Sequence, residues 1–211
     1  MKIDSVLRSI IDELKNKYHC HTVILYGSRA RGDYTAASDY DVAGIIKSGE
    51  KVRIARFDDK NHVYLDLFIY PESLLSPPAI EHTTMADGVV VMEEGLFGSN
   101  LLAELKRMLA YPEKLPSDEL KARKVWYDKM LARAAMQDVE GKYRHIWAIF
   151  AILEDYFVFR NMPYQGPKQA FQYLRERDRS SFVLFETALN DTNNLDTLAN
   201  LLAVLPDIQC K

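Results

Sequence analysis

Hydrophobic positions along the chain change their spacing near residue 95. Before that point, residues 3–18 predict an amphipathic helix, because apolar side chains recur at helical intervals at Ile3, Val6, Leu7, Ile10, Ile11 and Leu14. Short apolar or alternating runs then predict strands at about 22–26, 42–46, 51–57, 62–70 and 88–92. The third and fourth of these runs flank the turn-like sequence Asp58-Asp59-Lys60-Asn61 and are typical of a hairpin.

After residue 95 the spacing is helical throughout. We expect helices at about 101–109, 117–139, 142–161, 167–177, 180–190 and 194–204. Ser117 is a good N-cap, Gly141 interrupts the second helix, and Pro163 stops the third. The pattern predicts an α/β fold of the α+β type, in which a small mixed-sheet domain, residues 1–97, precedes an α-helical bundle domain, residues 98–211.

A glycine-rich turn follows the first predicted strand, in the run GSRARGDYTAASDYD from Gly27 to Asp41. Gly27 lets the backbone approach a ligand closely, and Ser28 adds a hydroxyl beside the amides of the turn. If residues 29–32 begin a short helix, its free N–H groups and the guanidinium groups of Arg29 and Arg31 would attract phosphate. The alternative is an ordinary turn between two strands.

Two carboxylates end the same run. Asp39 and Asp41 are two residues apart at the predicted start of a strand, so their side chains point the same way. Two such carboxylates repel each other unless a cation lies between them, and oxygen ligands favour Mg²⁺ or Mn²⁺. The alternative is a solvated loop end in which Ser38 or Asp39 serves as a cap.

A third carboxylate, Asp66, lies in the middle of the strand predicted at 62–70, between apolar residues. Burying a carboxylate there is costly unless it is paired or binds a metal. A role as a metal ligand or a base is therefore one interpretation. The other is an ion pair with Arg53 or Arg56 on the neighbouring strand of the hairpin.

Together these residues resemble a known family. The order Gly27-Ser28, Arg31-Gly32, Ser38-Asp39-x-Asp41 and then Asp66 is similar to the nucleotidyltransferase superfamily that includes DNA polymerase beta. Within that superfamily, the compact spacing resembles the minimal and kanamycin-type nucleotidyltransferases, over about residues 20–95. The resemblance implies transfer of a nucleoside monophosphate from a nucleoside triphosphate (NTP) to an acceptor hydroxyl, with release of pyrophosphate.

The resemblance also implies a two-metal mechanism. Asp39 and Asp41 would hold two Mg²⁺ (or Mn²⁺) ions, and Asp66 would hold one of them and help to deprotonate the attacking hydroxyl. Two ions about 4 Å apart can stabilise both the attacking and the leaving oxygens at phosphorus. Gly27 and Ser28 would bind the triphosphate.

Two further residues of the loop are candidates for the nucleotide site. They are Ser38 and Arg31. Arg31 would neutralise charge on the pyrophosphate. Arg31 could equally form a structural ion pair within the loop.

The helical half resembles the bundle that follows the catalytic domain of kanamycin-type enzymes, by helix number and order and by the phrase GPKQAFQYL. Its aromatic-rich helix, predicted at about 142–161, includes Glu154 and Asp155. These carboxylates could bind a cationic acceptor or act as a general base. Alternatively, the segment is a bundle core with its carboxylates turned to solvent.

An RNase role is disfavoured, because no arginine precedes His145 at the spacing of ribonuclease bundles.

Composition narrows the class of protein. The chain has 211 residues, 48% of them hydrophobic, which is enough for a substantial core. A formal net charge of −3 argues against a nucleic-acid surface, so a polynucleotide acceptor is disfavoured. Cys20 and Cys210 form no disulfide framework, and the histidines lack the spacing of a zinc site. With no leader-like start or long apolar run, we expect a cytoplasmic protein without a membrane partner.

The acceptor is the main open question. Our first hypothesis is a small molecule similar to an aminoglycoside, because the fused helical domain can build an acceptor cleft and its carboxylates suit a cationic ligand. A protein hydroxyl, as in nucleotidylating antitoxins, is the second. The third is a nucleotide-binding regulator with little turnover, against which the three intact aspartates argue. The resemblance to kanamycin-type enzymes, whose site can be shared between subunits, suggests a homodimer.

Overall fold

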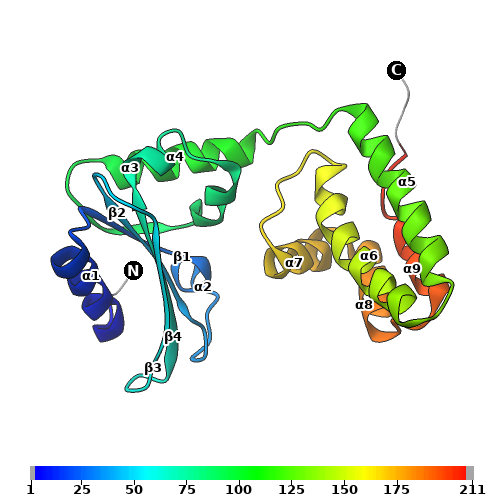
Figure 1. The fold of residues 1–211 in the computed structure, drawn as a ribbon, viewed down its shortest axis with the longest axis horizontal. Helices are drawn as coiled ribbons and strands as arrows, with labels where there is room; N and C mark the ends of the chain where they lie inside the picture. The colour runs from blue at the N-terminus through cyan, green and yellow to red at the C-terminus, as the bar shows by residue number, and fades with distance from the viewer. Residues whose placement is uncertain (1–2, 208–211) are drawn as a thin grey trace. The chain divides into compact units, whose positions relative to one another are not determined.

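The computed structural model describes residues 3–207 and divides the chain into two compact units, Met1–Tyr111 and Pro112–Lys211 (Figure 1). The first unit contains a five-stranded sheet. Its elements are α1 (Ser5–Tyr18), β1 (Thr22–Tyr26), α2 (Gly27–Arg31), β2 (Tyr40–Ile46), β3 (Val52–Asp58), β4 (Val63–Pro71), α3 (Glu72–Leu75), the 3₁₀ helix η1 (Ile80–Met85), β5 (Val89–Glu93) and α4 (Phe97–Ala110).

The sheet has the order β3-β4-β2-β1-β5. β2 and β4 run parallel, whereas the other neighbouring pairs are antiparallel. The predicted mixed sheet is therefore confirmed, and so is the hairpin of β3 and β4, which pair from Val52↔Ile69 to Asp58↔Val63. Because β2 and β4 are parallel neighbours, residues far apart in the sequence meet in the middle of the sheet.

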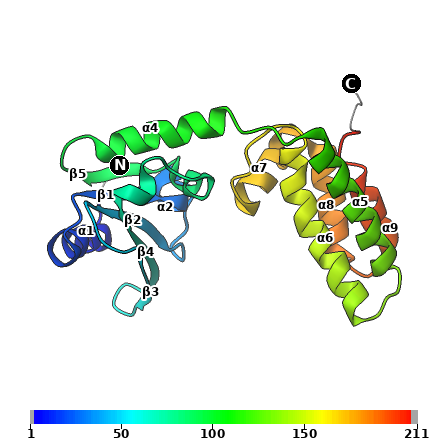
Figure 2. The ribbon, with the colours of Figure 1, turned by 45° about the horizontal axis from the view of Figure 1, so that its top comes forward.

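Helices cover the two faces of this sheet differently. α1 packs on one face through Leu7, Ile10 and Leu14, as its hydrophobic stripe predicted. α4 packs on the other face, together with η1. α2 follows β1 directly (Figures 1 and 2), and its Ala30 packs against the same buried cluster as Leu7 and Leu14 of α1.

The first unit extends further along the chain than the boundary at residue 97 that we expected. α4 belongs to it, because Leu101, Leu102 and Leu105 are buried in the same cluster as Ile24 and Ala43 of the sheet. The helical pattern alone could not show whether α4 packs on the sheet or in the bundle, since an apolar stripe fits either partner.

The second unit is helical, which confirms the predicted fold class. Its helices are α5 (Ser117–Ala134), α6 (Val139–Val158), α7 (Pro167–Arg177), α8 (Arg179–Asn190) and α9 (Leu195–Leu202). Gly141 does not interrupt a helix as predicted; it lies in the first turn of α6, and its N–H donates to the Asp138 carboxylate at 2.7 Å. A Cβ on Gly141 would lie 2.9 Å from the Arg133 carbonyl oxygen, so the glycine lets α6 start close to the end of α5.

Two sequence expectations concern the chain as a whole. Within residues 3–207, none of the helices combines the length and hydrophobicity that crossing a bilayer needs. Cys20 is a free thiol buried in the core under α1, whereas Cys210 falls outside the described residues.

Candidate active site

Three polar residues stand in one row across the middle of the sheet. Tyr26 on β1 pairs with Asp41 on β2, and Asp41 pairs with Asp66 on β4. Residues that pair directly across neighbouring strands project from the same face. The row ends at Ala55 on β3, which is paired with Asp66. The structure therefore brings Asp41 and Asp66 side by side, as the predicted site requires.

The lack of a side chain at Gly27 leaves room for the Asp41 carboxylate. It begins α2 immediately after β1 and has a positive φ of 70°, a conformation that favours glycine. A Cβ at this position would lie 2.2 Å from Asp41 Oδ2 and 3.0 Å from its Cγ. The glycine thus has a use that the sequence did not reveal, because it leaves the space in which the Asp41 carboxylate lies.

The electrostatics of the row follow from this crowding. Burial, and then the charges of Asp39 and Asp66, raise the pKa of Asp41 to about 6, although Arg31 opposes the shift. Burial and the neighbouring Asp41 likewise raise the pKa of Tyr26, so its hydroxyl stays neutral. Asp39 and Asp66 are therefore close enough to disfavour the charge of Asp41, and a cation beside Asp41 would relieve this effect.

Asp66 is already paired in this structure. Arg53 donates two hydrogen bonds to it, from Nε at 2.9 Å and from Nη2 at 2.8 Å. This confirms the ion pair considered above and identifies its partner, since Arg56 instead pairs with Glu13 of α1. Arg53 is thus a residue of the site. The sequence alone did not show whether Arg53 or Arg56 pairs with Asp66.

The loop between α2 and β2 is held by Arg29. Its Nη2 donates to the Ser38 carbonyl at 2.7 Å, and its Nε donates to the Asp39 carbonyl at 3.0 Å. The guanidinium also lies 3.8 Å from the centre of the Tyr40 ring. Arg29, which we expected to attract phosphate, is therefore used to fix the loop that carries Asp39, because carbonyl oxygens and a ring face already surround its charge.

The remaining nucleotide-site candidates in this loop also have local partners. The Ser38 hydroxyl accepts a hydrogen bond from the Thr35 N–H at 3.0 Å. Arg31 Nε lies 3.5 Å from Asp33 Oδ1, which is the structural ion pair considered as its alternative. Ser28 lies in the first turn of α2, and its carbonyl accepts from the N–H groups of Gly32 and Asp33 at 3.0 and 3.1 Å.

The fit of this site to a divalent metal is partial. Over residues 3–207, no three His, Cys, Asp or Glu side chains converge closely enough to hold a metal ion. The donors nevertheless suit Mg²⁺ in kind, because all three are carboxylates, and the charges of Asp39 and Asp66 add to burial in raising the pKa of Asp41. Asp66 would have to exchange Arg53 for the metal, so the two interactions compete.

In the second unit, Asp155 and Glu154 have different environments. Asp155 is buried, accepts a hydrogen bond from the Tyr127 hydroxyl at 2.7 Å and pairs with Arg123. Glu154 is exposed and borders a hollow of about 210 Å³ that Trp126 also lines. The expectation that the carboxylates of this helix turn to solvent is therefore wrong for Asp155, because polar side chains of α5 satisfy it in the interior.

Fold and site together define an α+β domain that presents carboxylates from two adjacent strands beside a Gly-Ser turn. Residues 8–94 match the family described as Polymerase beta, Nucleotidyltransferase. Residues 8–94, which are less than half of the chain, thus resemble a nucleotidyltransferase domain of the polymerase beta superfamily, and this match confirms the resemblance drawn from their motifs.

Two other comparisons complete this result. Among solved structures, a nucleotidyltransferase-like protein from Exiguobacterium sibiricum 255-15 shares 15% identity, with a TM-score of 0.42, over 94% of this chain and 72% of its own. No curated protein gives a significant match to the chain.

Proposed function

We propose that this protein transfers a nucleoside monophosphate from an NTP to a hydroxyl of a small acceptor, with release of pyrophosphate. The observation that supports this most is the row in which Asp41 and Asp66 pair across β2 and β4, with Gly27 of the Gly-Ser turn against Asp41. In the reaction, the acceptor oxygen forms a bond to the α-phosphorus of the NTP as the bond to pyrophosphate breaks.

Each residue of the site has a role in this proposal. Two Mg²⁺ or Mn²⁺ ions held by Asp39, Asp41 and Asp66 would supply charge stabilisation for the attacking and leaving oxygens. Asp66 would also accept the proton of the attacking hydroxyl once Arg53 releases it. Tyr26 stays neutral beside both carboxylates and so adds no negative charge to the row.

The nucleotide is proposed to lie at the start of α2. Gly27 and Ser28 would bind the triphosphate there, where the chain passes from β1 into α2 and the first N–H groups of a helix have no partner within it. Arg31, whose charge already reaches Asp41, would offset negative charge on the pyrophosphate. Ser38 would act through the loop that holds Asp39 in place.

For the acceptor, we propose a cationic small molecule resembling an aminoglycoside. Glu154 is the candidate contact in the helical unit, since its carboxylate is exposed beside Trp126 at the hollow described above. Asp155 is the weaker candidate, because Tyr127 and Arg123 already use its oxygens.

Pyrophosphate release tests the proposal. Purified protein with Mg²⁺ and each NTP in turn would be offered aminoglycosides, nucleosides and a whole-cell protein extract. Release with one small acceptor supports the proposal, and the Asp41→Asn variant should then lose at least about 100-fold in rate. Release with extract alone would replace it by protein nucleotidylation. Tight NTP binding without release would indicate a regulator.

A further inference from the structure

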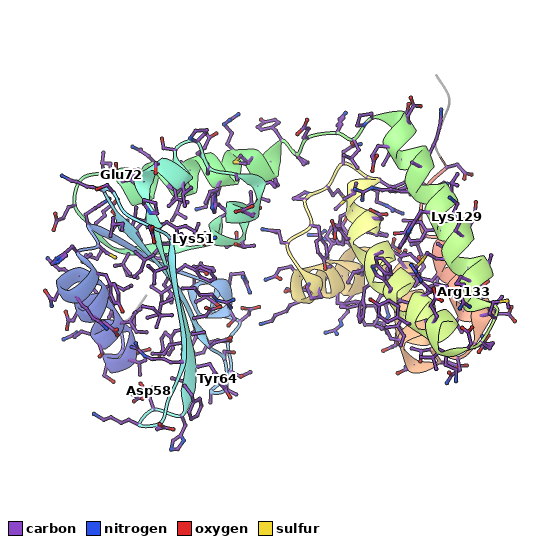
Figure 3. The ribbon with its side chains drawn as sticks, viewed as in Figure 1. Lys51, Asp58, Tyr64, Glu72, Lys129 and Arg133 are labelled. Carbon is purple, nitrogen blue, oxygen red and sulfur yellow. The ribbon has the colours of Figure 1, made fainter. Side chains whose placement is uncertain are left out.

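An exposed pair of aromatic rings continues the face of the sheet that carries Asp66. Tyr64 precedes Asp66 by two residues on β4, so both side chains project from the same face. On the edge strand β3, Phe57 pairs with Tyr64 as Ala55 pairs with Asp66. Figure 3 shows Tyr64 on the side of the sheet away from α1. The two rings therefore lie one row of residues beyond the carboxylates.

The rings contact each other but remain open to solvent. Their centroids are 4.8 Å apart with an interplanar angle of 59°, yet Tyr64 is 62% exposed and Phe57 41% exposed. The other face of the same strand behaves differently, since Val63 and Leu65 are buried in the core with α1. This end of the hairpin thus presents apolar ring area on the face that carries the site.

The space between the ring pair and Asp66 is not filled from β3. Ala55, which pairs with Asp66, is exposed and ends at its Cβ, so no β3 side chain at that position reaches over the carboxylate. Arg53 approaches Asp66 from the opposite direction, where its guanidinium lies 4.9 Å from the Phe68 ring centre. A ligand resting on Tyr64 can therefore extend to Asp66 without crossing Arg53.

We propose that Phe57 and Tyr64 form a stacking platform for a ring of the acceptor, placing a hydroxyl on that ring, or next to it, at Asp66. This deepens the proposed function and rests on it, since Asp66 is the group that would take the proton. Aromatic faces attract the apolar faces of sugars, nucleosides and cationic rings. Asp41 and Asp66 carry more negative charge than the single positive charge of Arg53 offsets, so the site favours a neutral or cationic ring over an anionic one.

Binding measurements with two ring-bearing probes, kanamycin and adenosine, test the platform apart from catalysis. Calorimetry with the full chain and Mg²⁺ should show that Tyr64→Leu weakens binding of the preferred probe about tenfold. Tyr64→Phe should keep most of the affinity, because the ring face remains. Tyr111→Leu is the matched control, since Tyr111 is also highly exposed in the first unit but lies at the end of α4.

Other outcomes would overturn the platform. One is equal probe affinity of wild type and Tyr64→Leu, and another is failure of wild type to bind either probe. The third is that Tyr64→Leu also loses affinity for a non-hydrolysable ATP analogue, which would place the nucleobase of the NTP on the rings instead. Failure of the proposed function would look different. If the probe binds and its binding depends on Tyr64, but no pyrophosphate is released, the platform is supported and the proposed reaction is not. If pyrophosphate is released and Tyr64→Leu does not change the acceptor KM, the reaction is supported and the platform is not.

Discussion

The carboxylate of Asp41 lies so close to the backbone of Gly27 that a Cβ on residue 27 would come within 2.2 Å of its Oδ2. This contact links the Gly-Ser turn directly to the strand that carries Asp41. It means that the glycine of the motif does more than permit a turn: it determines where a carboxylate of the candidate site can lie.

Replacing Gly27 by alanine should therefore cost both stability and activity. We expect a loss of about 2 kcal/mol or more in the free energy of unfolding, from the positive φ and the displaced carboxylate, and a fall in pyrophosphate release beyond about tenfold. Gly32→Ala is the control, since Gly32 has a φ of 84° but a Cβ added there would have no atom within 4 Å. It should lose only about 1 kcal/mol. Equal effects of both substitutions on activity would contradict the steric link to Asp41.

Protein stability without divalent ions should depend on pH through Asp41. Its pKa is raised from 3.8 to about 6 in the folded protein, so ionisation is disfavoured there relative to the unfolded chain. The stabilising contribution is complete below about pH 4 and is lost as the pH rises through about 6. Thermal unfolding should thus find Asp41→Asn more stable than wild type at about pH 7, on the order of 2 kcal/mol after solvent screening, and equal to it at about pH 4. A constant difference across this range would count against the raised pKa.

Removing Arg53 should make the site bind metal more readily. Arg53 and a metal compete for Asp66, so Arg53→Ala should lower the Mn²⁺ concentration for half-maximal thermal stabilisation by several-fold. Arg56→Ala serves as the control, because Arg56 lies on the same strand but pairs with Glu13. An unchanged metal requirement in Arg53→Ala would argue that Asp66 is not a ligand.

Alanine substitution should have different effects at the two acidic candidates on α6, Asp155 and Glu154. Asp155→Ala leaves the Tyr127 hydroxyl without its partner and Arg123 with Glu119 alone, so we expect a loss of about 3 kcal/mol in the stability of this unit, measured by denaturant unfolding. Glu154→Ala should leave stability within about 0.5 kcal/mol of wild type, because Glu154 is exposed. If Glu154 contacts the acceptor, this variant should raise the acceptor KM with NTP affinity unchanged. A stable Asp155→Ala protein would refute the structural role.

Local sequence patterns determined the elements and the kind of chemistry. Period-two alternation placed Asp66 on the opposite face from Leu65 and Leu67, because neighbouring strand residues point to opposite sides whatever the strand pairs with. The Gly-Ser turn and the aspartates that follow it indicated the family, which the match over residues 8–94 bears out. These features depend on a few consecutive residues, so the sequence displays them directly.

Only the tertiary structure decided which of these residues meet. The parallel pairing of β2 with β4 sets Asp41 beside Asp66, and the hairpin register selects Arg53 rather than Arg56 as the partner of Asp66. Packing also buried Asp155. Strand order, register and burial depend on how the whole core is filled, and many local patterns are compatible with more than one such arrangement. The sequence therefore determined the groups available for chemistry, whereas the packing of the chain determined their neighbours.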